Sequence, residues 1–260
     1  MTSALFKKIE RLHGSDPWGD VLDAGTGDKS LSWVAALPTK SWTAVTAQTV
    51  MAESARQALS VPPRDCDRIL TANWVDEQFL AGECFDTVLL DYTIGAVDAF
   101  APYFQESLLQ QMASRTLATL YITGLEPYVP IVADDEVGLF VGDLGRLRDA
   151  CMLLARDRPY REYPVSWVVA QLRRSGFTVK DAIHFRIRYR HQFLESQLAI
   201  CENRVDRFID SNLADAMRIY IAQMRKRGET LIDQHDGLYY GRNYVVRAVA
   251  GAPLPQPNSS

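Results

Sequence analysis

The sequence has little of what marks a metal site or a disulfide framework. Its 260 residues include four cysteines, at Cys66, Cys84, Cys151 and Cys201, and four histidines, at His13, His184, His191 and His235. The cysteines lie far apart without a Cys-x-x-Cys motif, and the histidines add no metal-ligand spacing. Widely separated cysteines of this kind are typical of buried thiols in a reducing compartment. We therefore expect buried free thiols, no bound metal and a cytoplasmic protein.

The sequence also lacks an excess of positive charge. Lysine and arginine number 28 against 32 aspartates and glutamates, which gives a net charge of −4. Nucleic-acid binders usually carry a basic excess or patch. The one basic segment, residues 185–191 (FRIRYRH), alternates arginine with other residues, which favours the solvated face of a strand over a phosphate-binding track. No N-terminal signal and no apolar run of membrane-spanning length is recognisable. We expect a small-molecule partner, and neither nucleic acid nor a membrane.

Short apolar segments alternate with helix-like segments in the first half of the chain. The expected strands are residues 21–24, 42–47, 68–74, 85–92 and 117–124, and the expected helices are residues 3–13, 31–37, 49–59 and 102–115. Two further strands are expected at residues 177–188 and 243–250. The pattern predicts an α/β, Rossmann-like fold with a mostly parallel seven-stranded sheet and helices on both faces.

The second half of the chain is richer in helical periodicity. Helices are expected at residues 137–157, 167–175, 191–210 and 213–227. We predict a single domain over residues 1–250, with a core of residues 18–128 and 163–250 and helical cap elements at residues 129–162 and 190–235. The helical insertion between the last two strands is expected to form either a lid or the surface of a homodimer. The proline-rich tail, residues 251–260, is expected to be disordered.

The stretch DAGTG, residues 23–27, follows the first expected strand and precedes a helix. It lacks the spacing of a phosphate-binding P-loop, and Ser30 stands where a dinucleotide-binding turn has its third glycine. Glycine without a Cβ lets the backbone approach a ligand closely. Because ligands of parallel α/β sheets bind outside the carboxyl ends of the strands, this turn is a candidate binding site.

The arrangement over residues 20–125 resembles the class I S-adenosylmethionine-dependent methyltransferases, with closing strands near residues 177–187 and 243–250. In that family the glycine motif begins with an acidic residue and often reads Asp-x-Gly-x-Gly, as residues 23–27 do here. The resemblance implies S-adenosyl-L-methionine as cofactor, a sulfonium whose methionine end carries an ammonium and a carboxylate. The cofactor-binding residues that it implies are Asp23, Gly25, Thr26, Gly27, Thr46, Gln48, Asn73, Trp74 and Asp91.

Two positions depart from the pattern of the family. Lys29 stands where many members have a third glycine. The second strand ends in VTAQT rather than in an acid that binds the ribose hydroxyls, so Thr46 or Gln48 must supply that contact with neutral hydrogen bonds. After the third strand, Asn73 stands where the family places a partner of the adenine amino group, and Trp74 stands beside it as an apolar wall.

In this family the methyl acceptor lies over the ends of the fourth and fifth strands, which are acidic and aromatic here. The implied catalytic residues are Asp91, Tyr92, Glu126 and Tyr128, and the implied substrate-binding residues are Asp98, Tyr103, Tyr240 and Arg242. No Asn-Pro-Pro-Tyr motif follows the fourth strand, and no cysteine is well placed as a catalytic thiol. These absences favour an oxygen or nitrogen of a small-molecule metabolite as acceptor. An RNA or protein methyltransferase, or a catalytically silent methyltransferase-like binding subunit, stays open.

Overall fold

The computed structural model describes residues 3–129 and 131–251. Within these residues the chain forms two compact units. The first comprises residues 3–125, 162–184 and 244–251, and the second comprises residues 126–129, 131–161 and 185–243. The predicted division into core and cap differs from these units mainly at the ends of the last two strands. The predicted disordered tail lies outside the described residues except for Gly251.

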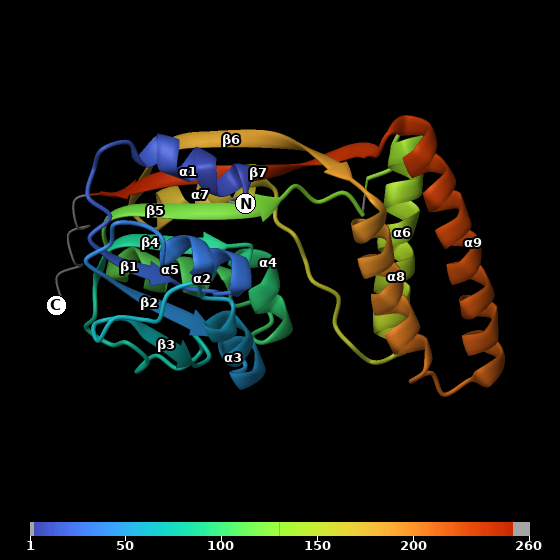
Figure 1. The fold of residues 1–260 in the computed structure, drawn as a ribbon, viewed down its shortest axis with the longest axis horizontal. Helices are drawn as coiled ribbons and strands as arrows, with labels where there is room; N and C mark the ends of the chain where they lie inside the picture. Colours follow the sequence, from blue (N-terminus) through green and yellow to red (C-terminus); the bar gives the residue numbers. More distant parts are fainter. Residues whose placement is uncertain (1–2, 130, 252–260) are drawn as a thin grey trace, which may run out of the picture. The chain divides into compact units, whose positions relative to one another are not determined.

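The first unit is built on a seven-stranded sheet with the strand order β3-β2-β1-β4-β5-β7-β6 (Figure 1). The strands are β1 (Asp20–Asp23), β2 (Ser41–Thr46), β3 (Arg68–Thr71), β4 (Phe85–Asp91), β5 (Thr116–Leu125), β6 (Phe177–Tyr189) and β7 (Leu238–Ala250). The central strand β4 is the most apolar, and its Val88 and Leu90 are fully buried. The edge strand β6 instead alternates between exposed and partly buried residues, which confirms that its arginine-rich segment continues a strand with one solvated face.

The prediction of a mostly parallel sheet is wrong, because the sheet is mixed. The strands from β1 to β5 pair in parallel. Strand β7, however, runs opposite to its neighbours β5 and β6 (Figure 1). The chain leaves β6 and enters β7 at the same end of the sheet, and neighbouring strands connected in that way must be antiparallel. Hydrophobic periodicity identifies a strand but carries no information on its direction.

The candidate site owes its position to the change of strand order around β1. Strand β1 pairs with β2 on one side and with β4 on the other. Because the chain proceeds outward in both directions from this point, a crevice opens at the carboxyl ends of β1 and β4. Asp23, Thr46, Thr71 and Asp91 are the last residues of their strands and therefore share this edge of the sheet.

Helices flank the sheet of the first unit. They are α1 (Ala4–His13), α2 (Asp28–Val34), α3 (Thr49–Gln57), α4 (Thr93–Ala96), the 3-10 helix η1 (Val97–Ala99), α5 (Gln105–Arg115) and α7 (Val165–Arg174). Helix α5 begins at Gln105 rather than at the predicted Pro102, because Tyr103 adopts a left-handed backbone conformation with φ of 67° that cannot belong to a helix.

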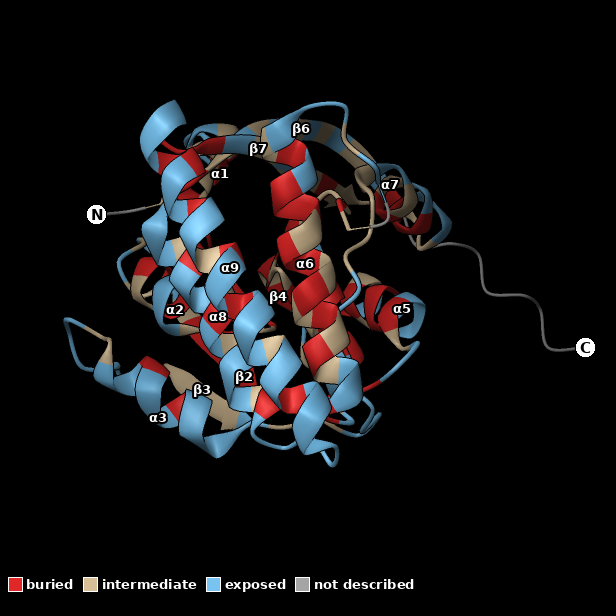
Figure 2. Cartoon of the chain, turned by 90° about the vertical axis from the view of Figure 1, so that its right-hand side faces the viewer, coloured by how far each residue is buried: buried red, intermediate tan, exposed pale blue. Residues whose placement is uncertain are grey.

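The second unit contains three long helices that pack against one another, α6 (Glu136–Leu154), α8 (His191–Val205) and α9 (Ser211–His235). Figure 2 shows α6 mostly buried and α9 mostly exposed. Gly228 of α9 lies against Phe140 and Leu194, and a Cβ at this position would stand 2.6 Å from the Phe140 ring. Helix α9 continues eight residues beyond the predicted end at Arg227, and β7 begins at Leu238 instead of Asn243.

The cysteines correct one expectation. Cys151 and Cys201 are buried free thiols, as predicted, whereas Cys66 and Cys84 are exposed. Both exposed residues precede a strand directly or by two positions, where side chains reach solvent. Among the described residues, no three His, Cys, Asp or Glu side chains are grouped so that they could hold a metal ion. Within the same residues, every helix is too short or too polar to cross a membrane.

Candidate functional site

The glycine turn at the end of β1 holds a buried carboxylate. Asp23 is fully buried, and its Oδ2 accepts a hydrogen bond of 2.6 Å from Thr26 Oγ1. Its Oδ1 has no hydrogen-bond partner among the described residues. Backbone bonds fasten the turn to both neighbouring strands: the Ala24 N–H donates to Leu89 O, and the Thr26 N–H donates to Val45 O. A rigid turn therefore presents a buried carboxylate oxygen without a partner, which is costly unless a ligand pairs with it.

A second carboxylate, Asp91 at the end of β4, lies close enough to interact with the first. Burial raises the pKa of Asp23 to about 7, and repulsion from Asp91 contributes, against the hydroxyl of Thr26 and weaker polar contacts from Ser30 and Gly25. Burial also raises the pKa of Asp91, against the Thr123 hydroxyl, which donates to Asp91 Oδ1 at 2.5 Å, and against the charge of Lys29. The two acids cannot both be charged in this environment without cost.

Lys29 is the cation that acts on Asp91. It lies exposed in the first turn of α2 and forms no hydrogen bond or ion pair with another described residue. Its charge nevertheless lowers the pKa of Asp91. Lys29 thus places a positive charge near Asp91.

The two glycines of the turn, Gly25 and Gly27, differ in the space that a side chain would find at each position. A Cβ on Gly25 would stand 2.2 Å from Thr93 Oγ1, so this glycine is required by packing against α4. A Cβ on Gly27 would meet nothing within 4 Å, and the residue has an extended backbone with φ of −134° and ψ of 177°, which any amino acid can adopt. The protein itself therefore does not need a glycine at residue 27, and the open space beside it is available to a ligand.

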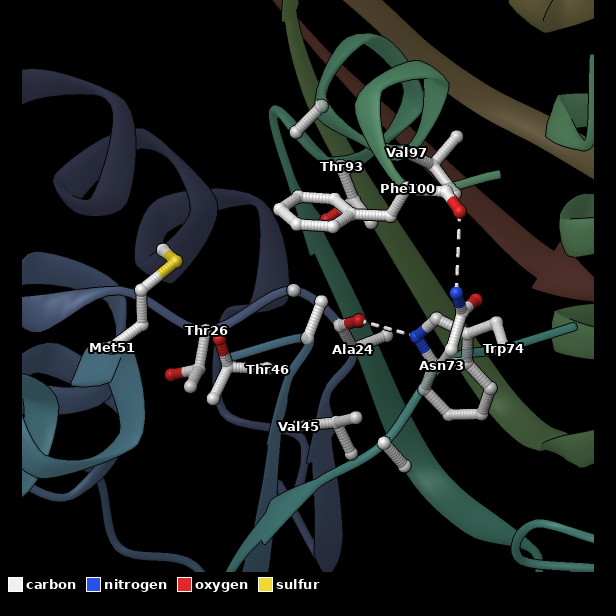
Figure 3. A pocket seen from close by; sticks show the side chains of 14 residues that line it. Ala24, Thr26, Val45, Thr46, Met51, Asn73, Trp74, Thr93, Val97 and Phe100 are labelled. Atoms are coloured by element: carbon white, nitrogen blue, oxygen red, sulfur yellow. Dashed lines mark hydrogen bonds between the residues drawn. The ribbon is translucent and has the colours of Figure 1, made fainter. Parts of the chain in front are cut away.

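An apolar pocket adjoins the turn at the ends of β1, β2 and β3 (Figure 3). The lining residues are Ala24, Gly25, Thr26, Val45, Thr46, Ala47, Met51, Ala72, Asn73, Trp74, Thr93, Ala96, Val97 and Phe100. The Trp74 Nε1–H donates to Ala24 O at 2.7 Å and so ties the wall of the pocket to the turn. The Asn73 Nδ2–H donates to Phe100 O at 3.3 Å and links two sides of the opening. Phe100 and Val45 face the cavity from opposite sides (Figure 3).

Of the residues predicted to contact the ribose and the adenine, Thr46 and Asn73 line the pocket and Gln48 does not. Thr46 is buried and lines the pocket, whereas Gln48 is exposed, precedes α3 and is not among the lining residues. Asn73 lines the pocket, but its amide is occupied: in addition to the bond to Phe100, its Oδ1 accepts from the Val75 N–H at 3.2 Å. The mouth of this pocket is neutral and differs in that respect from the end of β1.

Tyr92 follows Asp91 and has an unusual backbone. Its φ is 53°, a left-handed conformation that costs a non-glycine residue roughly 1–3 kcal/mol and is often found at functional sites. The Tyr92 N–H donates to Thr123 O. Burial raises the pKa of the Tyr92 hydroxyl, and the negative charges of Asp91 and Glu162 raise it further. Glu162 was missed by sequence reasoning, because it lies in a loop before α7 that only the tertiary structure brings near Tyr92.

Asp98 and Tyr103, predicted to bind substrate, have visible structural roles. Asp98 is buried, and its Oδ1 accepts from Gln105 Nε2 at 3.2 Å and from the Tyr103 N–H at 3.5 Å. These bonds hold the segment between η1 and α5. The Tyr103 side chain is 81% exposed. A substrate-binding role for either residue stays a prediction.

The remaining predicted residues belong to the second unit, where the structure brings them together. The Glu126 N–H donates to Arg242 O at 2.9 Å. The rings of Tyr128 and Tyr240 are 6.3 Å apart and nearly perpendicular, and Tyr128 is buried. Site residues that the sequence analysis did not single out include Thr93, Met51, Val97, Phe100 and Glu162. Of these, only the residues that follow Tyr92 belong to a recognisable apolar segment of the sequence.

Comparison with known proteins supports the fold. No protein-family model matches the chain, and no curated protein matches it. A Bacillus halodurans protein provisionally assigned as a methyltransferase has a TM-score of 0.62 at 14% identity, over 96% of this chain and 100% of that one. The magnesium protoporphyrin IX methyltransferase of Synechocystis, solved with bound S-adenosylhomocysteine, has a TM-score of 0.52 at 13% identity, over 95% and 80% of the two chains.

The chain therefore has the class I S-adenosylmethionine-dependent methyltransferase fold, as the resemblance in its sequence predicted. The same fold occurs in the [4+2]-cyclase SpnF, with a TM-score of 0.52 at 13% identity, over 96% of this chain and 81% of that one. A fold shared by enzymes of different names does not decide the reaction, so the function must be argued from the site.

Proposed function

We propose that the protein is an S-adenosylmethionine-dependent methyltransferase that acts on an oxygen or nitrogen of a small-molecule metabolite. The observation that carries this proposal is the end of β1, where the unpartnered Oδ1 of buried Asp23 lies in the same turn as the open space at Gly27. A ligand with a cationic group and a slender chain suits this turn.

The residues present fit the cofactor. Its ammonium group would be held by Asp23, its chain would pass Gly27, and its adenosine portion would occupy the apolar pocket beside Trp74 and Thr46. When bound, the cofactor supplies a methyl group on a positively charged sulfur. The neutral end of β2 supplies weaker hydrogen bonds to the ribose than an acid would.

Asp91, Tyr92 and Glu162 are the groups of the first unit that we propose to act on the acceptor. Methyl transfer requires a positioned nucleophile and, where that nucleophile carries a proton, a group to accept it. The raised pKa of Tyr92 keeps its hydroxyl protonated at neutral pH, so it serves as a hydrogen-bond donor. Asp91 and Glu162 are the candidate proton acceptors. Glu126, Tyr128, Tyr240 and Arg242 of the second unit stay predicted acceptor-site residues.

Calorimetric titration with S-adenosylmethionine and S-adenosylhomocysteine tests the cofactor assignment directly. We expect both to bind, and Gly27→Val to lose binding while its thermal unfolding stays that of the wild type. Absence of binding in the folded wild-type protein would reject the proposal.

A second measurement, methyl transfer to panels of small amines, alcohols, RNA and peptides, tests the acceptor class. Transfer to RNA or peptide only would favour the macromolecular alternative. Tight cofactor binding without transfer to any acceptor would favour a silent binding subunit. With a working acceptor, Asp91→Asn and Tyr92→Phe should lower turnover more than stability, because Asp91 ends β4 at the site and Tyr92 follows it directly.

A further inference from the structure

One charged group and two hydroxyl groups face Asp23 among the described contacts. Asp91 faces it from β4, and the hydroxyl groups of Thr26 and Ser30 face it from the turn and α2. Asp91 in turn is faced by the hydroxyl of Thr123 on β5 and by the charge of Lys29 on α2. Neither acid forms a salt bridge within the described part of the chain. The fully buried Asp23 and the half-buried Asp91 thus repel each other, and the exposed cation Lys29 acts on Asp91.

We propose, on the basis of the proposed function, that the fully buried Asp23 carries a proton in the free protein, and that the ammonium group of the bound cofactor displaces this proton into solvent. The geometry favours this exchange. Asp23 Oδ1 is buried without a hydrogen-bond partner and belongs to the same turn as the open position at Gly27. An ammonium group has three N–H donors, one of which can bond Asp23 Oδ1 once the carboxylate is charged.

The direction of the pH dependence follows from the buried acid. The pKa of Asp23 in the free protein is about 7, well above its ordinary value of 3.8. An adjacent ammonium favours the charged carboxylate and lowers that pKa, so binding releases a proton wherever Asp23 of the free protein is protonated. Affinity should therefore rise with pH up to about 7, by close to tenfold per pH unit, and then level off.

Calorimetry of S-adenosylhomocysteine in two buffers of different ionisation enthalpy measures the number of protons released. A matched ligand is 5′-methylthioadenosine, which has the same adenosine and thioether but lacks the amino-acid end. At about pH 6.5 we expect S-adenosylhomocysteine to release most of one proton and 5′-methylthioadenosine to release almost none. At about pH 8.5 both should bind without release.

The outcomes separate this inference from the proposed function. If both ligands bind and S-adenosylhomocysteine releases no proton at pH 6.5, or if both release the same number, the displaced proton of Asp23 is rejected while the cofactor site stands. If neither ligand binds, the proposed function fails and this inference fails with it.

A measurement on the free protein tests the proposal even if the variants no longer bind the ligand. Carboxyl NMR of the free protein should show an aspartate that titrates near pH 7 in the wild type, absent in Asp23→Asn and shifted to lower pH in Asp91→Asn, since the repulsive neighbour has been removed. Titration of every aspartate below about pH 5 would overturn the proposal.

Discussion

Two halves of the same sheet edge differ in charge. The ends of β1 and β4 carry Asp23 and Asp91, both largely removed from solvent and both with raised pKa values. The ends of β2 and β3 carry the neutral side chains of Thr46 and Asn73 around an apolar pocket. The charged groups of the first unit's site are thus concentrated at the switch point between β1 and β4.

The contrast suggests how a ligand is divided between the two halves. A cationic, flexible portion is favoured where Asp23 Oδ1 lacks a partner, and a flat, weakly polar portion is favoured where the walls are apolar. The two halves also contribute to the stability of the free protein with opposite signs. The acidic half destabilises the folded chain, whereas the neutral half stabilises it by burying apolar side chains. Four experiments would break or sharpen this comparison.

The largest effect is expected from Asp23→Asn on stability. The pKa of Asp23 is higher in the folded chain, about 7, than in the unfolded chain, where the ordinary value is 3.8. The folded state therefore binds the proton more tightly, and the free energy of unfolding falls as pH rises from about 4 to about 7, by roughly 4 kcal/mol in total. Asparagine cannot ionise and can still accept from Thr26.

Denaturant unfolding of both proteins at several pH values checks this. Asp23→Asn should be the more stable protein at pH 8, with the advantage shrinking towards zero at pH 4. A constant difference between the two proteins across that range would contradict a buried ionisable Asp23.

The next effect concerns the two glycines. Gly27→Val should weaken S-adenosylhomocysteine binding by at least about a hundredfold, close to 3 kcal/mol, because the new side chain fills the space left for the ligand. Its stability should stay at the wild-type level.

Gly25→Ala is the matched control. Its Cβ would overlap the Thr93 side chain, so it should unfold more easily, by about 1–3 kcal/mol. Thermal unfolding of both variants, and their titration with S-adenosylhomocysteine, measure the two effects separately. Equal loss of stability in the two would remove the distinction between a packing glycine and a ligand-facing glycine.

Trp74→Phe tests the neutral half. The substitution keeps most of the apolar surface but removes the Nε1–H that bonds Ala24 O, which leaves a buried carbonyl without its donor. We expect a loss of about 1–2 kcal/mol in the free energy of unfolding, measured with denaturant, and weaker binding of 5′-methylthioadenosine. Wild-type values for both would show that this bond does not organise the pocket.

The smallest effect is expected from restoring an acid after β2. Gln48→Glu should tighten binding of S-adenosylhomocysteine by about fivefold, roughly 1 kcal/mol, if a carboxylate there reaches the ribose hydroxyls. Thr46→Asp is the alternative, although Thr46 is buried and a carboxylate there pays for desolvation. If neither acid, nor Thr46→Val or Gln48→Ala, changes the dissociation constant, these residues do not contact the ribose.

The fold was largely predictable because its signals are local. Each strand from β1 to β5 is a short apolar run bounded by glycine, proline or polar residues, and the alternation with helices identifies the fold class without any knowledge of distant contacts. The turn at residues 23–27 was recognisable for the same reason. The start of α5 and the end of α9 were less accurate, because a left-handed residue and helix packing set them.

The sequence by itself determined which segments are strands, that the carboxyl ends of β1 to β5 share one edge, and that an acidic glycine turn opens there. These properties depend on side-chain periodicity and on residues adjacent in the chain. Only the tertiary structure decided the reversed direction of β7, the exposure of Cys66 and Cys84, the approach of Glu162 to Tyr92, and the repulsion between Asp23 and Asp91. The reason is physical: direction, burial and a shifted pKa arise from groups far apart in sequence, and no local pattern encodes the distance between them.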